Sequence, residues 1–390
     1  MTGNRTWDVV IVGAGMVGAA CAYYTRAAGL SVALVDRGHV AGGTTGAGEG
    51  NLLVSDKEPG PELELALLSM RLWRDLAAEL PGTLEYEPKG GLVVATSPQR
   101  LPVLRTLAAR QAEHGVAVEE IPAERLREIE PHLADGLPGG VRYAQDAQVQ
   151  PALAAAQLLR AARRAGTELL LGTEATGMLL GPDGSVRGLR TDRHGVLGCR
   201  AVVNAAGTWG GRIAELAGVE MPLLPRRGFV LVTEPLPPLV RHKVYAADYV
   251  ADVGSGSADL RSSAVVEGTR AGPVLVGASR ERVGFDRGPA PRVLRRLAAQ
   301  AVALFPVLAG VQVLRAYRGF RPYLPDHLPV IGADPRAPGL FHACGHEGAG
   351  IGLAPATGLL LAQLLSGRPT ELDLSAFRPD RFPPRPQETT

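Results

Sequence analysis

The chain has 390 residues, of which 46% are hydrophobic and 21% are charged, and its formal net charge is +2. This composition is typical of a soluble globular protein, and the length suggests two domains or one large discontinuous domain. The near-neutral charge argues against nucleic acid or an anionic membrane surface as a partner. No stretch reaches 18 uninterrupted apolar residues, so we predict no transmembrane segment and a cytoplasmic location.

The three cysteines, Cys21, Cys199 and Cys344, are far apart in the sequence and show no C-x-x-C spacing. This pattern argues against a disulfide framework, a zinc site or an iron–sulfur cluster within the chain, and it suits a reducing compartment. We therefore predict no metal site.

The chain begins with a strand–helix–strand pattern. The sequence WDVVIVGAG (7–15) predicts a buried strand, MVGAACAYYTRAAG (16–29) a helix, and LSVALVD (30–36) a second buried strand. Further helices are predicted over 62–80, 98–112, 150–165, 209–217, 290–304 and 351–366, and strands over 91–95, 168–171, 174–180, 186–191, 200–204, 228–234, 263–267, 273–277 and 311–318.

Two strand-containing segments, 84–96 and 226–235, lie among turn residues. Each of them is predicted to belong to an antiparallel sheet. Parallel and antiparallel patterns therefore alternate along the chain. This alternation predicts an α/β fold in which two domains are interleaved in sequence.

A glycine-rich turn follows the first strand. Its residues have the spacing G-x-G-x-x-G, and an acidic residue ends the next strand: Gly13, Ala14, Gly15, Met16, Val17 and Gly18, then Asp36. Such glycines permit a tight turn, close approach of a pyrophosphate and close helix–strand packing, while the helix N-terminus attracts phosphate. The acid can accept hydrogen bonds from ribose hydroxyls. The pattern predicts a dinucleotide site and leaves NAD and FAD open.

Three further segments favour FAD over an NAD-dependent dehydrogenase built on the same turn. A polar, glycine-dense loop over 37–53 replaces a crossover helix and offers backbone N–H groups and the hydroxyls of Thr44 and Thr45 to a long cofactor. A buried strand ends at Ala206 and Gly207, small residues that let backbone approach a nucleotide. A second glycine-rich turn, GHEGAGIGLAPATG, occupies 345–358.

Together with the C-terminal segment 326–367, these motifs resemble the D-amino-acid oxidase superfamily of FAD-dependent amine oxidoreductases, from Asp8 to about Arg368. The pattern is most similar to glycine oxidases and to flavoprotein subunits of opine oxidase, hydrogen cyanide synthase and D-hydroxyproline dehydrogenase. The resemblance implies a Rossmann-like FAD-binding domain over 1–85, 145–220 and 325–370. It also implies an α+β substrate domain with an antiparallel sheet over 86–144 and 221–324, and a C-terminal tail over 371–390.

The resemblance implies that the first turn binds the FAD pyrophosphate and that the second lies at the flavin ring, where a helix starting near Ile351 would direct its N-terminus. The resemblance also implies that the FAD is noncovalent. Sarcosine oxidase-like members attach the flavin to a Cys in the region of Arg321, and dimethylglycine dehydrogenase-like members attach it to a His of the early loop, whereas here 315–329 lacks Cys and the GGTTGAG segment lacks His. The remaining cofactor-binding candidates are Arg37, Gly48, Glu174, Trp209, Gly345, Gly348, Gly350 and Gly352.

The family removes a hydride from the carbon next to an amine nitrogen, which gives an imine that water hydrolyses. The matching position for the carboxylate-binding arginine is Arg321, with Arg318 as the alternative. The other catalytic candidates include His346, Glu347 and Glu49. Each of these side chains would polarise the flavin, orient the amine or form a structural hydrogen bond. Tyr249 is the last catalytic candidate and, like Tyr317 and Tyr323, would line the substrate pocket. No general base is obvious, and oxidation of the neutral amine needs none.

The predicted substrate is a small amino acid or amine of the D-amino acid, glycine, hydroxyproline or opine type. The segment 265–287 is most similar to the subunits that work with other chains. We therefore expect a dehydrogenase that passes electrons to a partner, in a hetero-oligomer with an NAD/FAD-type subunit and a small [2Fe–2S] protein. The alternatives are an oxidase that uses O₂ and a catalytically idle FAD-binding subunit.

Overall fold

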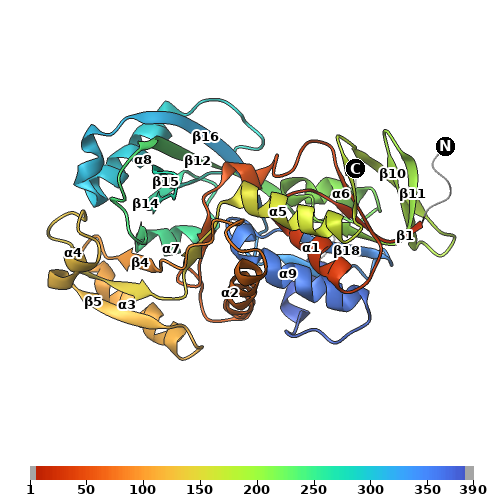
Figure 1. Ribbon diagram of the computed structural model, residues 1–390, viewed down its shortest axis with the longest axis horizontal. Helices are drawn as coiled ribbons and strands as arrows, with labels where there is room; N and C mark the ends of the chain where they lie inside the picture. The colour runs from red at the N-terminus through yellow and green to blue at the C-terminus, as the bar shows by residue number, and fades with distance from the viewer. Residues whose placement is uncertain (1–5, 383–390) are drawn as a thin grey trace, which may run out of the picture. The chain divides into compact units, whose positions relative to one another are not determined.

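The computed structural model describes residues 6–382, and at Ala251 it describes the backbone only. The chain divides into two compact units (Figure 1). Unit 1 comprises Met1–Gly46, Ala152–Leu224 and Arg321–Thr390, and unit 2 comprises Ala47–Pro151 and Pro225–Phe320. Residues 47–85, which the sequence analysis assigns to the FAD-binding domain, fall in unit 2, and the functional domain boundaries stay a prediction. Residues 383–390 of the predicted tail lie outside the described residues.

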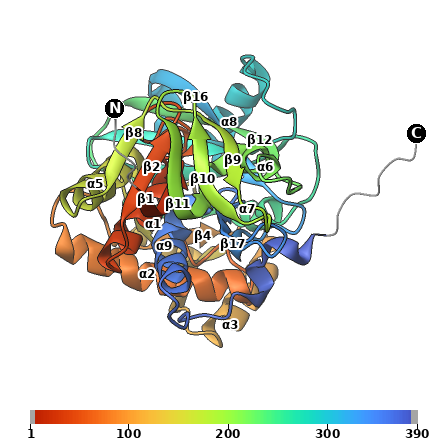
Figure 2. The same ribbon diagram turned by 90° about the vertical axis from the view of Figure 1, so that its right-hand side faces the viewer.

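Unit 1 is built on a mostly parallel sheet, seen in Figure 2, with the order β17-β18-β11-β1-β2-β8. The strands from β18 to β8 run parallel, β17 is antiparallel to β18, and β10 and β9 continue from β11 as an antiparallel ribbon. The bounds are β1 (Thr6–Val12), β2 (Val32–Asp36), β8 (Glu168–Leu171), β9 (Ala175–Leu180), β10 (Val186–Thr191), β11 (Gly195–Asn204), β17 (Val330–Ala333) and β18 (Leu340–Cys344).

Two helices from opposite ends of the chain pack against each other in unit 1, α1 (Met16–Ala27) and α9 (Gly350–Leu365) (Figure 2). Gly358 permits this contact, because a Cβ there would come within 2.7 Å of the Ala20 backbone. A core that includes Val10, Val35 and Met178 joins β1 and β2 to β9. The remaining helices of unit 1 are α5 (Pro151–Arg164), α6 (Gly210–Glu215) and the 3₁₀ turns η1 (Thr44–Ala47), η3 (Gly207–Trp209), η5 (Ser375–Phe377) and η6 (Pro379–Arg381).

Unit 2 contains a second sheet, with the order β16-β12-β15-β14-β13-β4-β6-β5. Its recorded pairs are antiparallel except for β13 and β4, which run parallel. The bounds are β4 (Gly91–Val94), β5 (Val118–Pro122), β6 (Gly139–Tyr143), β12 (Leu224–Pro235), β13 (Lys243–Ala246), β14 (Arg261–Gly268), β15 (Pro273–Arg280) and β16 (Val313–Tyr323), with β3 (Asn51–Leu52) and β7 (Ala147–Gln148) as a separate antiparallel pair.

The antiparallel pairing predicted for segment 84–96 is found on one side of its strand only. Its strand β4 is antiparallel to β6 but parallel to β13, which comes from a segment about 150 residues later. Turn residues on either side of a strand do not reveal a partner that far away in the chain. The prediction for segment 226–235 holds, since β12 is antiparallel to β15.

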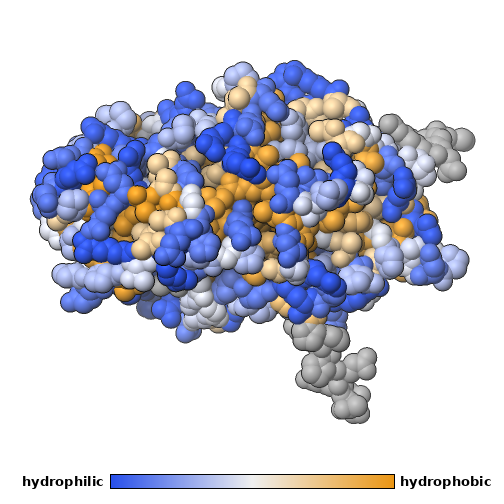
Figure 3. Space-filling model, turned by 90° about the horizontal axis from the view of Figure 1, so that it is seen from below, coloured by the Kyte–Doolittle hydropathy of each residue, from blue (hydrophilic) through white to orange (hydrophobic). Residues whose placement is uncertain are grey.

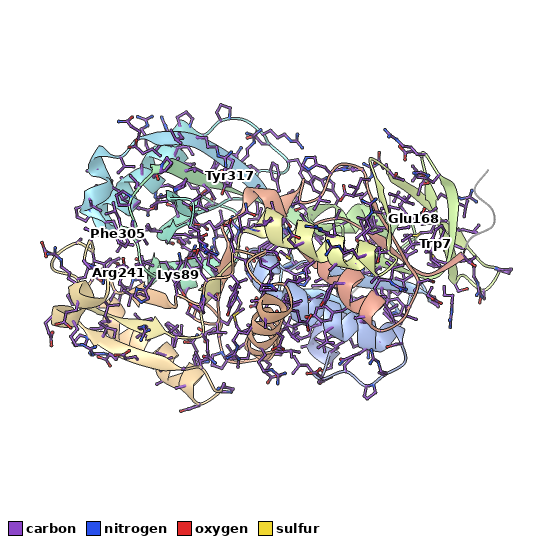
Figure 4. All side chains as sticks on the ribbon, in the orientation of Figure 1. Trp7, Lys89, Glu168, Arg241, Phe305 and Tyr317 are labelled. Atoms are coloured by element: carbon purple, nitrogen blue, oxygen red, sulfur yellow. The ribbon has the colours of Figure 1, made fainter. Side chains whose placement is uncertain are left out.

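The core of unit 2 lies between the sheet and α8 (Pro291–Leu304). Leu297 and Leu304 of α8 pack with Val266 of β14 and Val276 of β15, and Phe305, labelled in Figure 4, is fully buried directly after the helix. The other helices are α2 (Pro61–Glu79), α3 (Arg100–Ala112), α4 (Leu126–Ile129), α7 (Asp248–Val253) and the 3₁₀ turns η2 (Ala123–Arg125) and η4 (Pro306–Gly310).

The face shown in Figure 3 is largely hydrophilic, with apolar side chains between the charged ones. Large exposed apolar residues such as Val103 and Leu314 occur at separate places in the sequence. Within residues 6–382, no helix is long and apolar enough to cross a membrane. The same residues contain no group of three or more His, Cys, Asp or Glu side chains that could hold a metal ion.

Candidate FAD site and its surroundings

The first glycine turn connects β1 to α1 through positions where a side chain would not fit. Gly13 has φ +118°, and a Cβ there would overlap the carbonyl oxygen of Ala205. A Cβ at Gly18 would overlap the carbonyl oxygen of Gly13. The first and third glycines of the motif therefore have the packing roles that the sequence predicts for them.

The N-terminus of α1 is suited to an anion. Gly15 is its N-cap and has no side chain to occupy the free N–H groups, and none of the residues of the first turn, 16–19, is acidic. Thr45 comes close enough to accept a hydrogen bond from the Met16 N–H at 3.0 Å. This bare helix start fits the pyrophosphate of a dinucleotide.

Asp36 holds the glycine turn in place. Its Oδ2 accepts a hydrogen bond from the Ala14 N–H at 2.8 Å, and its Oδ1 accepts one from the Gly38 N–H at 2.7 Å. Each carboxylate oxygen has a second lone pair, so the side chain retains capacity for a ribose hydroxyl.

Three other cofactor-binding candidates, Arg37, Thr44 and Glu174, each lie close to another side chain of unit 1. The guanidinium of Arg37 lies 4.4 Å from the ring centroid of Trp209. Thr44 Oγ1 lies 3.4 Å from Thr208 Oγ1, next to Gly207. Glu174, whose side chain is 40% exposed, lies 3.4 Å from Arg212. Arg37 and Thr44 of the early loop therefore lie beside the residues that follow β11. Glu174 instead forms a surface ion pair.

The second glycine turn connects β18 to α9. Gly345 has φ +81° and Glu347 has φ +46°, while Gly348 is exposed. The helix starts at Gly350, one residue before the predicted Ile351, so that Gly352 lies in its first turn. Pro355 is the sixth residue of α9 and lies inside the helix.

His346 is buried inside this turn and is neutral. Its Nε2 lies 2.9 Å from the Thr357 hydroxyl, which donates its proton to the Leu353 carbonyl at 2.9 Å. The hydroxyl has only one proton, so His346 Nε2–H must be the donor of the first bond. Burial lowers the pKa of His346 to about 3, so the imidazole connects the turn to α9 without carrying charge.

Glu347 also has contacts within unit 1. Its Oε2 lies 2.9 Å from His327 Nδ1, and its backbone N–H donates to the Pro322 carbonyl at 3.1 Å. The contacts connect the turn to the end of β16 and to the segment that follows this strand. They favour the structural interpretation of Glu347 that the sequence analysis left open.

Arg321, near the end of β16, lies against the exposed part of the turn. It is half-buried, and a Cβ added at Gly348 would lie 3.4 Å from its Nε. Arg318, the alternative, is exposed on the same strand. Tyr323 packs edge-on against His327, with ring centroids 5.2 Å apart.

Gly48 and Glu49 belong to unit 2. The Gly48 carbonyl accepts a hydrogen bond from Tyr317 at 3.1 Å, and Figure 4 labels this tyrosine on β16. Glu49 is 8% exposed, and its Oε1 lies 4.0 Å from Lys243 Nζ. Lys243, fully buried, forms a close ion pair with Glu267. Glu49 is thus part of a buried ionic cluster.

Tyr249 lies on α7 in unit 2 and is 7% exposed. Its ring packs edge-on against Tyr245 at 5.1 Å, and the guanidinium of Arg280 lies 5.0 Å from its centroid. Arg280, Lys243 and Glu267 are buried charged residues that were not predicted from the sequence. Nothing in the sequence separates them from the other Arg, Lys and Glu residues, because their burial depends on how distant strands pair.

Comparison with protein-family models matches residues 8–364 to DAO, FAD dependent oxidoreductase. Hydrogen cyanide synthase subunit HcnC of Pseudomonas aeruginosa is 31% identical over 425 residues, covering 98% of this chain and 98% of that protein. The structure of glycine oxidase from Geobacillus kaustophilus has a TM-score of 0.88 and 28% identity, covering 98% of this chain and 100% of that one. Iminodiacetate oxidase from Chelativorans sp. BNC1 has a TM-score of 0.83 and 26% identity, covering 95% and 98%.

These matches confirm the predicted α/β fold and FAD as the cofactor. The family match includes both glycine turns and the helices that follow them. The contacts of the individual candidates do not test their roles toward cofactor or substrate, and those roles stay predictions. Because the match extends over most of its length, the chain belongs to the DAO family of FAD-dependent oxidoreductases.

Proposed function

We propose that this protein is an FAD-dependent dehydrogenase that oxidises the C–N bond of an amino acid or secondary amine and passes the electrons to a partner. The observation that carries the proposal is Arg321, half-buried against the exposed Gly348 of the second glycine turn. The names of similar proteins support the oxidation of a C–N bond, since they include a glycine oxidase and an iminodiacetate oxidase. Glycine and iminodiacetate both carry an amine next to a carboxylate.

The chain's own residues would hold FAD noncovalently at two places in unit 1. The N-terminus of α1 would bind the pyrophosphate through its N–H groups, with Asp36 toward the ribose. The exposed backbone of the second turn and the N-terminus of α9 would lie at the ring. Bound FAD supplies the hydride acceptor.

Arg321 would bind the substrate carboxylate. A guanidinium donates two parallel hydrogen bonds to a carboxylate, which fixes both the position and the direction of the ligand. The position of Arg321 beside Gly348 would therefore orient the carbon next to the amine.

His346 and Glu347 act in this proposal as positioning residues. His346 connects the second turn to Thr357 of α9, and Glu347 connects it to His327 and Pro322. With a pKa of about 3, His346 is a poor proton acceptor at neutral pH, which agrees with oxidation of an amine that arrives neutral.

The electron acceptor would be a partner chain. The similar hydrogen cyanide synthase protein is named as a subunit. We propose a hetero-oligomer with an NAD/FAD-type subunit and a small [2Fe–2S] protein. A cytoplasmic location is part of the proposal, and the three cysteines are buried free thiols.

The test is anaerobic reduction of the purified FAD-loaded protein by glycine, sarcosine, D-amino acids, the isomers of proline and hydroxyproline, and opines. Loss of the flavin absorbance near 450 nm with at least one amine is the expected result. A protein that takes up no FAD would contradict the proposal. A yellow protein that no amine reduces would indicate the idle subunit.

A second measurement separates dehydrogenase from oxidase. Slow reoxidation by O₂ and fast reoxidation by an artificial acceptor support the dehydrogenase. Rapid reoxidation by O₂ would instead support an oxidase, which the likeness to glycine oxidase makes the second candidate.

Arg321→Met should raise KM for the reducing amine by about 10- to 100-fold, from the loss of a charge-assisted pair. The matched control is Arg318→Met on the same strand, where the side chain is exposed. FAD content should be unchanged in both variants. Equal KM values for the two variants would remove Arg321 from the proposal.

A further inference from the structure

The loop that directly follows β16 supports the second glycine turn of unit 1. A Cβ at Gly345 would overlap Leu324 Cδ1, so the side chain of Leu324 packs against the bare backbone of this glycine. Further along the same loop, His327 Nδ1 lies 2.9 Å from Glu347 Oε2. The loop therefore contacts the turn at two places, through one apolar and one polar side chain.

The part of the loop around His327 is tightly folded. The His327 N–H donates to the Leu324 carbonyl at 3.0 Å, and the Leu328 N–H donates to Asp326 Oδ1 at 3.2 Å. His327 itself has φ +61°, in the left-handed region that residues other than glycine rarely adopt. Such a conformation persists only where neighbouring contacts hold it. The direction of the imidazole toward Glu347 therefore depends on what fixes the loop.

Arg381, the last residue of η6, fixes this loop from the C-terminal end of the chain. Its Nε donates to Asp326 Oδ2 at 2.7 Å, and its Nη2 lies 3.3 Å from Asp326 Oδ1. The same Nη2 donates to the Leu328 carbonyl at 2.7 Å. One guanidinium thus binds the residues on both sides of His327.

The geometry of this pair makes it more than an ordinary surface contact. The Arg381 side chain is 16% exposed and that of Asp326 is 35% exposed, and a bidentate pair between guanidinium and carboxylate fixes direction as well as distance. The guanidinium also lies 4.5 Å from the ring centroid of Phe382. Phe382 in turn anchors the segment, because it packs against a small core of Leu223, Leu324, Val330 and Cys344.

We propose that Arg381 is a positioning residue for the second glycine turn and, through the turn, for the flavin. Arg381 fixes His327 by binding both of its neighbours in the chain, and His327 fixes Glu347. These residues all belong to unit 1. The inference rests on the part of the proposed function that assigns the flavin ring to this turn, and it is independent of the substrate and of the electron acceptor.

The experiment measures how fast FAD leaves the diluted holoprotein, followed by the increase in flavin fluorescence. Arg381→Gln should accelerate release by about 2- to 30-fold, the range for a residue coupled to a site that it does not touch. Arg381→Lys keeps the charge but lacks the planar fork that reaches Asp326 and Leu328 together, so it should lie between Arg381→Gln and the wild type.

Arg378→Gln is the matched control. Arg378 directly precedes η6, has a side chain that is 61% exposed and pairs with Asp380 of its own segment at 2.5 Å. Removing this pair leaves the bonds from Arg381 to the loop in place. FAD release should therefore be as in the wild type. The melting temperature of each variant establishes that the rates are compared on folded protein.

A double variant separates positioning from a general structural role. His327→Asn removes the imidazole and keeps a residue that tolerates left-handed backbone. It should accelerate FAD release as Arg381→Gln does. Because both changes break the same connection to the turn, the double variant should release FAD no faster than the faster single variant. Two independent structural losses would instead multiply in the rate.

Two results would overturn the inference. The first is a wild-type rate of FAD release in folded Arg381→Gln. The second is a double variant whose acceleration equals the product of the two single ones. If Arg381→Gln does not fold, Arg381→Lys alone and combined with His327→Asn decides the question in the same way.

The release rates also distinguish this inference from the proposed oxidation. If Arg381→Gln accelerates FAD release as expected while no amine reduces the wild-type flavin, the proposed oxidation fails and the positioning role stands. If an amine reduces the flavin while Arg381→Gln releases FAD at the wild-type rate, the oxidation stands and the positioning role fails.

Discussion

Unit 2 contains two buried cations with opposite surroundings. Lys243 is fully buried, forms an ion pair with Glu267 and lies 4.0 Å from Glu49. Arg280 is 3% exposed and has the ring of Tyr249 as its one recorded side-chain contact within residues 6–382. The charge of Lys243 is therefore neutralised by carboxylates of its own unit, whereas the charge of Arg280 faces an aromatic ring, which offsets less of the cost of burial.

Glu49 is a weaker catalytic candidate than its burial suggests, because its carboxylate belongs to the cluster around Lys243. Its Oε2 lies 3.4 Å from Asn51 Nδ2, and a Cβ at Gly277 would come within 2.7 Å of its Oε1. The carboxylate is therefore held by residues of its own unit. We expect it to contribute to stability, and a role toward the flavin or the amine stays a prediction.

The largest effect on stability should come from removing Lys243, the buried cation that is paired with a carboxylate. Lys243→Met leaves Glu267 and Glu49 buried without their shared counter-charge, so we expect the free energy of unfolding to fall by about 3–5 kcal/mol. Urea unfolding followed by fluorescence measures this loss.

The double variant Lys243→Met/Glu267→Gln is the control for that loss. It removes both members of the pair and should recover part of the stability, because the buried negative charge is gone as well. A single variant as stable as the wild type would mean that Lys243 is not needed to neutralise the cluster.

A second effect concerns His346, an ionisable side chain that is buried without charge. Burial lowers its pKa to about 3, whereas an unfolded chain has the ordinary value of about 6.5. Below pH 6.5 the unfolded state binds the extra proton, so stability falls as the pH decreases, by about 1.4 kcal/mol per pH unit. At pH 5 the loss should be about 2 kcal/mol.

The measurement is the free energy of unfolding of wild type minus that of His346→Gln, from pH 8 to pH 5. The subtraction removes the other titrating groups, among them Asp146, whose pKa burial raises to about 7 and whose contribution has the opposite sign. A difference that does not change with pH would show that His346 titrates normally in the folded protein.

A smaller effect, of opposite sign to that at Lys243, is expected at Arg280. Arg280→Met removes a buried cation that has no counter-charge among the described residues, so the free energy of unfolding should rise by about 1 kcal/mol. Differential scanning calorimetry should show an increased melting temperature. A loss as large as that of Lys243→Met would mean that Arg280 is a structural cation, and the comparison would fail.

The fold was largely predictable because its elements carry local signals. The strand before Gly13 and the helices at 61–79 and 291–304 have continuous or periodic apolar patterns, and the structure confirms them. Strands such as β6 (Gly139–Tyr143) and β13 (Lys243–Ala246) were missed, since they are short and contain glycine or lysine. They are stabilised by pairing with distant strands, which a local pattern does not contain.

The site was predictable where backbone chemistry defines it. Gly13 and Gly18 must be glycine for steric reasons, so their spacing is visible in the sequence. Arg280 has no such signature among 41 basic residues, because its burial against the ring of Tyr249 depends on how distant elements pack. His346 was visible, but its neutral state follows from its burial in the folded turn, which the local sequence does not show.

The smallest effect should come from the ring of Tyr249. The attraction between Arg280 and this residue comes from the face of the ring, which phenylalanine retains and leucine lacks. The free energy of unfolding of Tyr249→Leu should therefore be lower than that of Tyr249→Phe by about 0.5–2 kcal/mol in urea unfolding. Using Tyr249→Phe as the reference separates the ring from the hydroxyl, because both variants lack the hydroxyl. Equal stability of the two variants would mean that the ring face does not stabilise the buried charge of Arg280.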